Sequence, residues 1–270
     1  MERPAWAPRS IDISVPSVSR IYDYYLGGSH NFEVDREAAR KAMEHLPGLP
    51  KIMQANRAFM RRAVRFAADQ GITQFLDIGS GIPTFGNAHE VAQKANPGAR
   101  VVYVDHDPVA VAHSRAVLEG NDDADVVAAD LRKPQEILAS AQVQRLIDLN
   151  RPVALLLVAI LHFVEDADDP YGAVAELRDA LAPGSLLLLT HASYEGIPLP
   201  PGRAEGAVDV YKDIRSPLIM RSRDEIARFF EGYEMVEPGL VPMPRWRPET
   251  APEEEDPYAF SGFAGVGRTA

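Results

Sequence analysis

The sequence predicts an α/β fold with a doubly wound, mostly parallel sheet. Between residues 72 and 192, segments of strand character alternate with helical segments, which is typical of a parallel sheet covered by helices on both faces. Two strand-like runs near the C-terminus, 233–243 and 258–268, have no helix between them, so we expect them to pair antiparallel. Residues 1–70 lack strand signals and are expected to form a helical cap, which leaves 71–270 as the core.

Two helices are expected in the cap. The first covers residues 19–26, with Ser19 as its N-cap and a glycine pair as its stop. The second covers residues 50–70, where apolar side chains recur close to helical spacing before a glycine ends the run.

The alternating part supplies the strands of the sheet. The run at 152–160 is continuously apolar, as expected of a central strand buried on both faces. The five expected strands cover 73–79, 100–107, 124–130, 152–160 and 185–193. The helices between and after them are expected at 86–96, 107–121, 134–149, 170–184 and 222–232.

Composition and charge exclude several classes of function. The chain has no cysteine, which excludes a disulfide scaffold, a cysteine nucleophile and a zinc site built on thiolates. A net charge of −11 disfavours sequence-independent binding to nucleic acid, which relies on Lys and Arg contacts to phosphates. The longest apolar run, 153–164, is too short to span a bilayer, and the N-terminus has no stretch suited to a signal peptide. We therefore expect a cytoplasmic protein with neither membrane nor nucleic acid among its partners.

A glycine-rich turn, FLDIGSGIPTFGN, follows the first strand. Gly79 and Gly81 fit the dinucleotide-binding pattern G-x-G-x-x-G, but Thr84 stands where the third glycine belongs. That glycine lets helix and strand pack closely, so its absence weakens an NAD site. A tight turn without a ligand is the alternative.

Aspartates end the next two strands. Asp105 ends the second strand, where an acidic residue can accept hydrogen bonds from both ribose hydroxyls of a nucleoside. Asp130 ends the third strand, where a carboxylate can accept from an exocyclic amine such as that of adenine. Each aspartate alone could be a helix N-cap or a solvated turn. Together with the glycine turn they lie at the carboxyl edge of one sheet, where open α/β sheets bind ligands.

The segments FLDIGSG, VVYVDHDP and AADLR look like the first three motifs of class I S-adenosylmethionine-dependent methyltransferases. Longer stretches, such as PSVSRIYDYYLGGSHNFEVDREAA and RPVALLLVAILHFVEDADDP, are similar to an actinobacterial S-adenosyl methyltransferase family, over nearly the whole chain. The resemblance implies a Rossmann-like class I methyltransferase fold, with a seven-stranded sheet whose last strand is antiparallel. It also implies S-adenosylmethionine as the cofactor and leaves the methyl acceptor undefined.

The same resemblance assigns cofactor contacts. It places Gly79, Ser80 and Gly81 against the methionine part of S-adenosylmethionine, and Asp77 orders that loop.

For the nucleoside part, the resemblance assigns the ribose hydroxyls to Asp105 and places His106 beside the adenine. Asp130 and Leu131 take the adenine edge.

Methyl transfer needs little catalytic machinery. The sulfonium is already electrophilic, so the enzyme mainly has to hold the acceptor atom in line with the methyl group. His162, at the end of the fourth strand, is the candidate general base. The alternative is a histidine that closes the strand with a backbone hydrogen bond. The sequence predicts no metal site, and it lacks an Asn-Pro-Pro-Tyr-type motif after the fourth strand, which again disfavours nucleic acid.

The segment YDYYLGGSHNF suggests a lid over the cofactor. Tyr24 is the candidate aromatic face near the sulfonium, and the glycine pair after it is the candidate hinge. The alternative is an N-terminal helix whose aromatic residues pack on the sheet. Methyltransferases of this fold often take acceptor specificity from N-terminal additions, so we place the acceptor pocket there.

An arginine stripe follows in the cap. Arg57, Arg61 and Arg65 share one helical face at a spacing of four. Arg57 is the candidate for holding the cofactor's carboxylate, and the alternative is a solvated face that pairs with nearby acids.

We therefore expect an S-adenosylmethionine-dependent methyltransferase that acts on a small-molecule acceptor. The alternatives are a non-catalytic sensor of S-adenosylmethionine or its demethylated product, and an NAD-linked oxidoreductase. An open polar pocket beside the methyl group favours catalysis, whereas a sealed or purely apolar one favours a sensor. The oligomeric state is left open.

Overall fold

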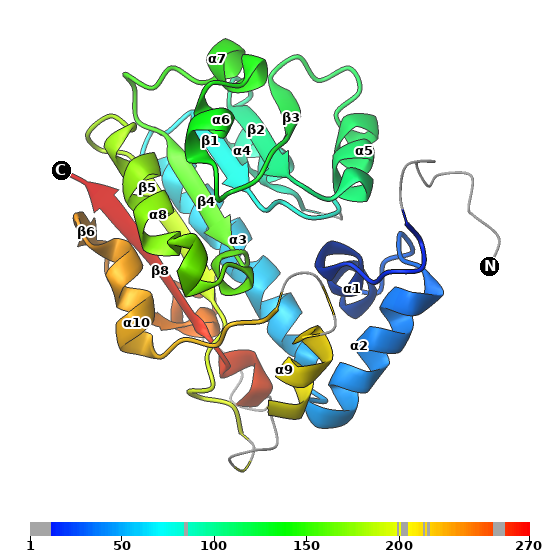
Figure 1. Cartoon of the computed structure of the whole chain (residues 1–270). Helices are drawn as coiled ribbons and strands as arrows, with labels where there is room; N and C mark the ends of the chain where they lie inside the picture. The colour runs from blue at the N-terminus through cyan, green and yellow to red at the C-terminus, as the bar shows by residue number, and fades with distance from the viewer. Residues whose placement is uncertain are drawn as a thin grey trace.

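The structure is a computed structural model, and it describes residues 12–83, 86–198, 200, 205–212, 214, 217–250 and 257–270. The described strands form one sheet in the order β3-β2-β1-β4-β5-β8-β6, with β7 paired to β8 (Figure 1). The strands are β1 Gln74–Ile78, β2 Arg100–Asp105, β3 Ala124–Ala128, β4 Ala154–Val158, β5 Leu186–His191, β6 Tyr233–Met235, β7 Val241–Pro242 and β8 Phe263–Thr269.

Strands β1 to β5 are parallel, and β8 runs antiparallel to β5, β6 and β7. The predicted doubly wound, mostly parallel sheet with an antiparallel last strand is confirmed. The run at 233–243 gives two strands in place of one, because Pro238 and Gly239, whose φ is 83°, turn the chain between β6 and β7. The seven predicted strands correspond to the hydrogen-bonded path, and the two-residue β7 is additional.

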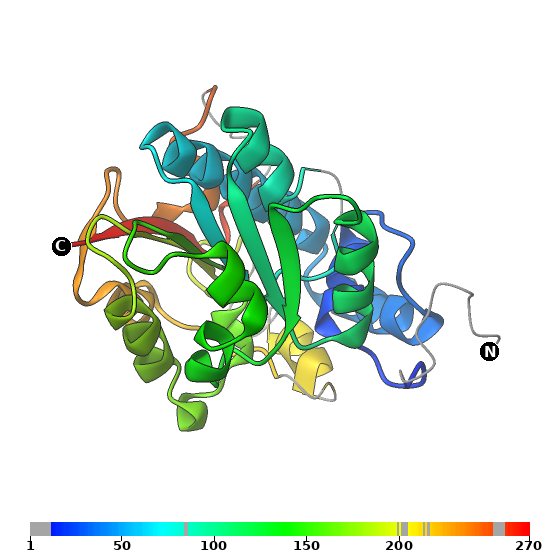
Figure 2. The ribbon, with the colours of Figure 1, turned by 90° about the horizontal axis from the view of Figure 1, so that it is seen from above.

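Helices cover both faces of the sheet (Figure 2). They are α1 Val18–Tyr25, α2 Glu33–His45, α3 Leu49–Asp69, α4 Ala88–Ala95, α5 Pro108–Val117, α6 Pro134–Leu138, α7 Ala141–Leu146, α8 Pro170–Asp179, α9 Glu205–Lys212 and α10 Arg223–Ala227. The single helix expected at 134–149 is two helices, since the side chain of Ser140 accepts a hydrogen bond from the Val143 amide and so caps α7.

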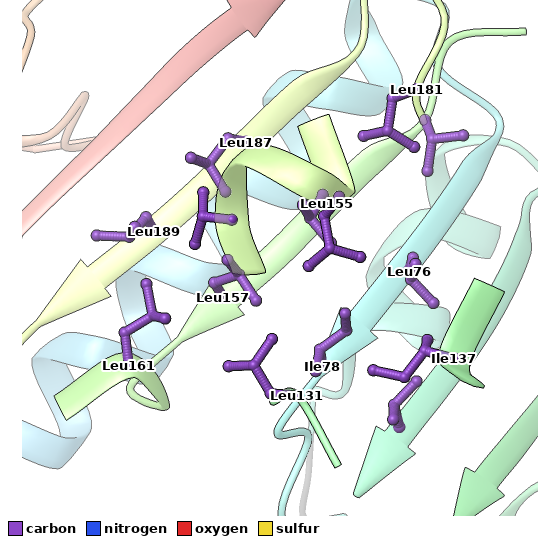
Figure 3. Close-up of a cluster of buried hydrophobic side chains, with 14 of the residues drawn as sticks. Leu76, Ile78, Leu131, Ile137, Leu155, Leu157, Leu161, Leu181, Leu187 and Leu189 are labelled. Carbon is purple, nitrogen blue, oxygen red and sulfur yellow. The ribbon is translucent and has the colours of Figure 1, made fainter. Parts of the chain in front are cut away.

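Successive strand residues point to opposite faces and build two cores. Leu76 and Leu155 belong to the core that α6, α7 and α8 cover, as Figure 3 shows. Their chain neighbours Phe75 and Leu156 belong to the core under α3, α4 and α5. Asp77 therefore lies on the same face of the sheet as Phe75, toward α3.

A third apolar cluster joins α1 and α2 to α9, which the sequence did not predict. These helices gather on the side to which the arrows of β1 and β4 point (Figure 1). Helix α3 takes part in two clusters: Leu49 belongs to the third one, whereas Phe59 lies in the core on the sheet. The division into a cap over 1–70 and a core over 71–270 stays a prediction; α3 lies within 1–70 but contributes to the core on the sheet as well as to the third cluster.

The described part of the chain lacks two further features. None of its helices combines the length and the apolar character that crossing a bilayer requires. Its histidine and acidic side chains form no group of three or more that could hold a metal ion.

Candidate functional site

The turn after β1 is built by two glycines. Gly79 and Gly81 have φ values of 76° and 67°, which favour glycine. A Cβ on Gly79 would come within 2.4 Å of the Ile160 side chain. The amides of Gly79 and Ser80 both donate to the Val104 carbonyl, over 2.8 and 3.2 Å, so the turn is pinned to the end of β2. Thr84 lies outside the described residues.

Asp105 fixes the same turn from β2. Its Oδ2 accepts a hydrogen bond from the Gly81 amide over 2.7 Å, and its Oδ1 accepts from the Asp107 amide over 2.8 Å. Burial raises the pKa of Asp105, and these two amides oppose the rise. A carboxylate offers about four acceptor sites, so Asp105 retains lone pairs for a ligand.

Asp77 is a second buried carboxylate at the carboxyl edge. Burial raises its pKa from 3.8 to about 7, Arg57 acts to lower the pKa, and Asp105 acts to raise it. Arg57 extends from α3 and donates from Nη2 to Asn87 Oδ1 over 3.2 Å. The site therefore holds two interacting buried carboxylates beside one guanidinium.

These groups surround a cavity of about 630 Å³, partly open to solvent, which we call the central cavity. Its lining includes the predicted cofactor residues Arg57, Asp77, Gly79, Ser80, Gly81, Asp105 and His106. The hydroxyl of Ser80 is buried and has no hydrogen-bond partner among the described residues. A ligand in the central cavity could supply that partner.

A second cavity, of about 680 Å³, lies beside the central cavity, and we call it the edge cavity. It shares Gly79, Asp105 and His106 with the central cavity and adds Asp130 and Leu131. The two cavities together therefore bring all of the predicted cofactor residues except Tyr24 to one edge of the sheet.

Asp130 and Leu131 have structural partners as well. The Arg132 guanidinium donates to the Asp130 carboxylate over 2.5 Å and lowers its pKa. Arg132 also reaches Asp168 over 3.3 Å. The Leu131 side chain lies among the core leucines near Leu157 (Figure 3).

Tyr22, not Tyr24, lines the central cavity. Tyr24 packs against the third apolar cluster and interacts with Arg40 of α2. The physical reason is helical phase: residues two positions apart on an α-helix point about 200° apart. Val18, Tyr22 and Tyr25, spaced by four and three, share the cavity-facing side of α1. The spacing was visible in the sequence, but the side of α1 that faces the cavity was not.

A third cavity, of about 730 Å³, lies under α1, α3 and α9, and we call it the apolar cavity. Most of its lining is aliphatic or aromatic, and it includes Tyr25, Leu49, Met53, Phe163, Ile197, Tyr211, Leu218 and Met243. It shares one wall with the central cavity, formed by Val18, Tyr22, Asn56, Ala159 and Phe163.

That shared wall contains a chain of hydrogen bonds. The amide of Ala159, whose φ is 58°, donates to Thr190 Oγ over 2.8 Å. Thr190 donates to Asn56 Oδ1 over 2.6 Å, and Asn56 Nδ2 donates to the Tyr22 hydroxyl over 2.8 Å. We call this chain the polar junction.

The sequence reasoning missed Asn56 and Thr190. Both carry a signal in hindsight. Asn56 falls on the apolar face of α3, four residues after Ile52 and three before Phe59, and Thr190 follows an unbroken run of four leucines in β5.

His162 lines the apolar cavity and not the central one. Its Nδ1 accepts a hydrogen bond from the Ala192 amide over 3.3 Å. Burial lowers the pKa of His162 well below 6.5, and the nearby His191 and Arg221 lower it further. A neutral imidazole that accepts at Nδ1 carries its proton at Nε2, so His162 offers a donor and not a base. This geometry matches the alternative of a backbone hydrogen bond that closes the strand.

The arginine stripe of α3 separates in the structure. Arg57 lines the central cavity. Arg61 donates to the Gly86 carbonyl over 3.3 Å, and Arg65 forms an exposed ion pair with Glu249 over 3.1 Å. Only the first of the three arginines lines a cofactor-side cavity.

Comparison with known proteins gives a consistent assignment. A family model described as S-adenosyl methyltransferase matches residues 4–270. A solved protein from Thermobifida fusca, with a provisional assignment as a methyltransferase, is 42% identical, with a TM-score of 0.91 over 98% of this chain and 99% of that chain. A solved DUF574 family protein from Streptomyces avermitilis is 38% identical, with a TM-score of 0.90, and the match covers 96% of this chain and 99% of that chain.

A more distant structure shares the fold alone. It is the N-methyltransferase NodS from Bradyrhizobium japonicum in complex with S-adenosyl-L-homocysteine, 16% identical with a TM-score of 0.51 over 93% of this chain and 98% of that one. No curated protein matches the chain.

Proposed function

The chain belongs to the S-adenosyl methyltransferase family, and from that premise we propose that it transfers the methyl group of S-adenosylmethionine to a small-molecule acceptor. The cofactor occupies the central and edge cavities. The acceptor occupies the apolar cavity. The observation that carries the proposal is the wall shared by the central and apolar cavities, because two bound molecules can meet there.

The electrostatics of the central cavity suit a ligand of mixed charge. S-adenosylmethionine carries a carboxylate together with an ammonium and a sulfonium. Arg57 is placed to attract the carboxylate, and the buried pair Asp77 and Asp105 attracts positive charge. The unpartnered hydroxyl of Ser80 can bind the same end of the cofactor. In the edge cavity, His106, Asp130 and Leu131 border the adenine.

The ribose meets Asp105. Its carboxylate is already oriented by the amides of Gly81 and Asp107, and each oxygen keeps a lone pair for a hydroxyl. Loss of this carboxylate removes both the ribose contact and the anchor of the glycine turn.

The transfer itself is a displacement at carbon. A lone pair of the acceptor atom forms the new bond to the methyl carbon, and the carbon–sulfur bond breaks with its electron pair left on sulfur. The products are the methylated acceptor and S-adenosylhomocysteine, whose sulfur atom is uncharged. A proton on the acceptor atom is released to water through the open side of the central cavity. The protein contributes position and exclusion of bulk water, and His162 contributes a hydrogen-bond donor on the acceptor side.

A sensor that binds the cofactor without transferring the methyl group is the second candidate. The apolar lining of the acceptor cavity favours it, whereas the polar junction between the cavities favours catalysis. We weigh the junction more heavily, because a sensor needs no second cavity that shares a wall with the cofactor cavity.

The test is transfer of a labelled methyl group. The purified protein is incubated with trideuteromethyl S-adenosylmethionine and a cell extract of Thermobifida fusca separated into small-molecule, protein and nucleic-acid fractions. We expect label in the small-molecule fraction together with S-adenosylhomocysteine, and neither product with Asp105→Ala. Label in a macromolecular fraction would contradict the small-molecule acceptor. Cofactor binding without any transfer would support the sensor.

A further inference from the structure

The lining of the apolar cavity carries information about what it binds. None of the described residues that line it is an aspartate, glutamate, lysine or arginine. Burying an ionised ligand group without an opposite charge is costly. The part of the lining that the structure describes therefore disfavours both anions and cations.

The two histidines of the lining do not alter this conclusion. The ring of His191 is fully engaged, since Nδ1 donates to the Ala192 carbonyl over 2.7 Å and Nε2 accepts from Arg221 over 2.9 Å. Burial lowers the pKa of His191 to about 3. His162 is likewise neutral, because burial lowers its pKa well below 6.5.

A buried cation, Arg221, contacts His191 and is already compensated. Arg221 is buried, and it donates to the carbonyls of Leu161 and Val164 and to the carboxylate of Asp166. Arg221 is not part of the cavity lining. Its charge is thus directed at the loop after β4 and not at a ligand.

The shape-determining side chains are aromatic. Tyr22, Tyr25, Phe163 and Tyr211 surround the cavity from α1, the turn after β4 and α9. The hydroxyls of Tyr25 and Tyr211 lie 3.2 Å apart, so that one donates a hydrogen bond to the other. These residues therefore offer ring surfaces, which favour a planar aromatic ligand.

A few neutral polar groups remain for the ligand. The hydroxyl of Ser261 is buried, lines the cavity and has no hydrogen-bond partner among the described residues. The cavity is also lined by the polar junction of Asn56, Thr190 and Tyr22, of which Asn56 and Tyr22 border the central cavity. Such groups bind uncharged oxygen or nitrogen substituents.

We propose that the acceptor is an uncharged aromatic small molecule with a hydroxyl or neutral nitrogen substituent, bound in the apolar cavity with that substituent at the polar junction. This assignment rests on the proposed function for its reaction, but the binding it describes can be measured without any transfer. The space of about 730 Å³ between the lining residues includes the side of the cavity that is open to solvent.

The probes are three naphthalenes of matched size: neutral 2-naphthol, anionic 2-naphthoate and cationic 2-naphthylmethylammonium. Binding of each is measured at neutral pH by calorimetry and ligand-observed NMR, with and without S-adenosylhomocysteine. Met53→Trp fills the cavity from α3. Gln54→Trp is the matched control, because Gln54 is the exposed neighbour of Met53 on the same helix and does not line the apolar cavity.

We expect 2-naphthol to bind, and both charged probes to bind at least about tenfold more weakly. Met53→Trp should weaken 2-naphthol binding by about tenfold or more while the affinity for S-adenosylhomocysteine stays within about twofold, and Gln54→Trp should change neither. The retained S-adenosylhomocysteine binding shows that the variant is folded.

Three results would overturn the proposal: a charged probe that binds as tightly as 2-naphthol, 2-naphthol binding that Met53→Trp leaves unchanged, or no binding of 2-naphthol to a protein that binds S-adenosylhomocysteine. If 2-naphthol binds as expected but S-adenosylhomocysteine does not, the character of the cavity stands and the proposed methyl transfer fails.

Discussion

The hydroxyl of Thr190 donates a hydrogen bond to Asn56 Oδ1 over 2.6 Å, and this contact joins β5 to α3 at the boundary between the central and apolar cavities. It fixes the orientation of the Asn56 amide, so that Nδ2 points to the hydroxyl of Tyr22. Since the amide of Ala159 also donates to Thr190, one hydroxyl organises the wall where the two substrates would meet.

Replacing Thr190 by valine should destabilise the protein. The substitution keeps the side-chain shape but leaves Asn56 Oδ1 and the Ala159 amide without their partner in a buried site. We expect a loss of about 1–3 kcal/mol in the free energy of unfolding, measured by urea denaturation. Thr190→Ser keeps the hydroxyl and is the control; an equal loss in both variants would mean that the methyl group, and not the hydrogen bonds, is responsible.

Asp77→Asn should stabilise the cofactor-free protein at alkaline pH. The pKa of Asp77 rises from 3.8 to about 7 on folding, so the folded state holds the proton more tightly than the unfolded state. The wild type therefore loses stability as the pH rises from about 4 to about 7, by at most about 4 kcal/mol. Asparagine removes that loss.

The measurement is urea unfolding of the wild type and Asp77→Asn at pH values below and above this window. The gain from the substitution should appear only on the alkaline side. The exposed Asp122→Asn serves as control and should change stability at neither pH. A destabilised Asp77→Asn protein at alkaline pH would show that ionised Asp77 is stabilised in the fold, against the stated direction.

Tyr22 and Tyr24 should differ in their effect on the cofactor. Tyr22 lines the central cavity, whereas Tyr24 packs among the cap helices. We expect Tyr22→Ala to weaken S-adenosylmethionine binding by about tenfold, the range of a lost cation–π contact, and Tyr24→Ala to leave it within about twofold. The affinity of both variants for S-adenosylmethionine is measured by calorimetry. A larger loss of affinity in Tyr24→Ala than in Tyr22→Ala would instead support Tyr24 as the aromatic face near the sulfonium.

His162 should not titrate near neutrality. Burial lowers its pKa well below 6.5, and the Ala192 amide donates to Nδ1. Nitrogen NMR of the imidazole should show a protonated Nε2 and an unprotonated Nδ1, unchanged as the pH is varied from about 6 to about 8. A titration midpoint near neutrality would instead support a general base.

Part of this site could be predicted from the sequence because its geometry is local. The glycine turn follows β1 directly, and Asp105 ends the neighbouring parallel strand, so topology alone brings them together. The antiparallel pairing of β8 with β6 followed in the same way from two strand-like runs without a helix between them.

The features of the site that could not be predicted depend on contacts between segments that are distant in the sequence. Tyr25 contacts Tyr211 of α9, which is 186 positions away in the chain, and no helical pattern in the sequence is strong enough to predict α9 there. The choice of Tyr24 over Tyr22 was a matter of helical phase, which requires knowing which side of α1 faces the sheet. His162 appeared as a base because the Ala192 amide that occupies its Nδ1 comes from another strand end.

Calorimetric titration with S-adenosylmethionine, S-adenosylhomocysteine and NAD, repeated on Asp105→Ala, tests the central claim most directly. Micromolar binding of both sulfur nucleosides to the wild type, lost in Asp105→Ala, is the predicted result, and thermal unfolding of the unliganded variant checks that it is folded. Binding of NAD alone, or equal binding of the sulfur nucleosides by the wild type and Asp105→Ala, would contradict the assignment of the central cavity as the S-adenosylmethionine site.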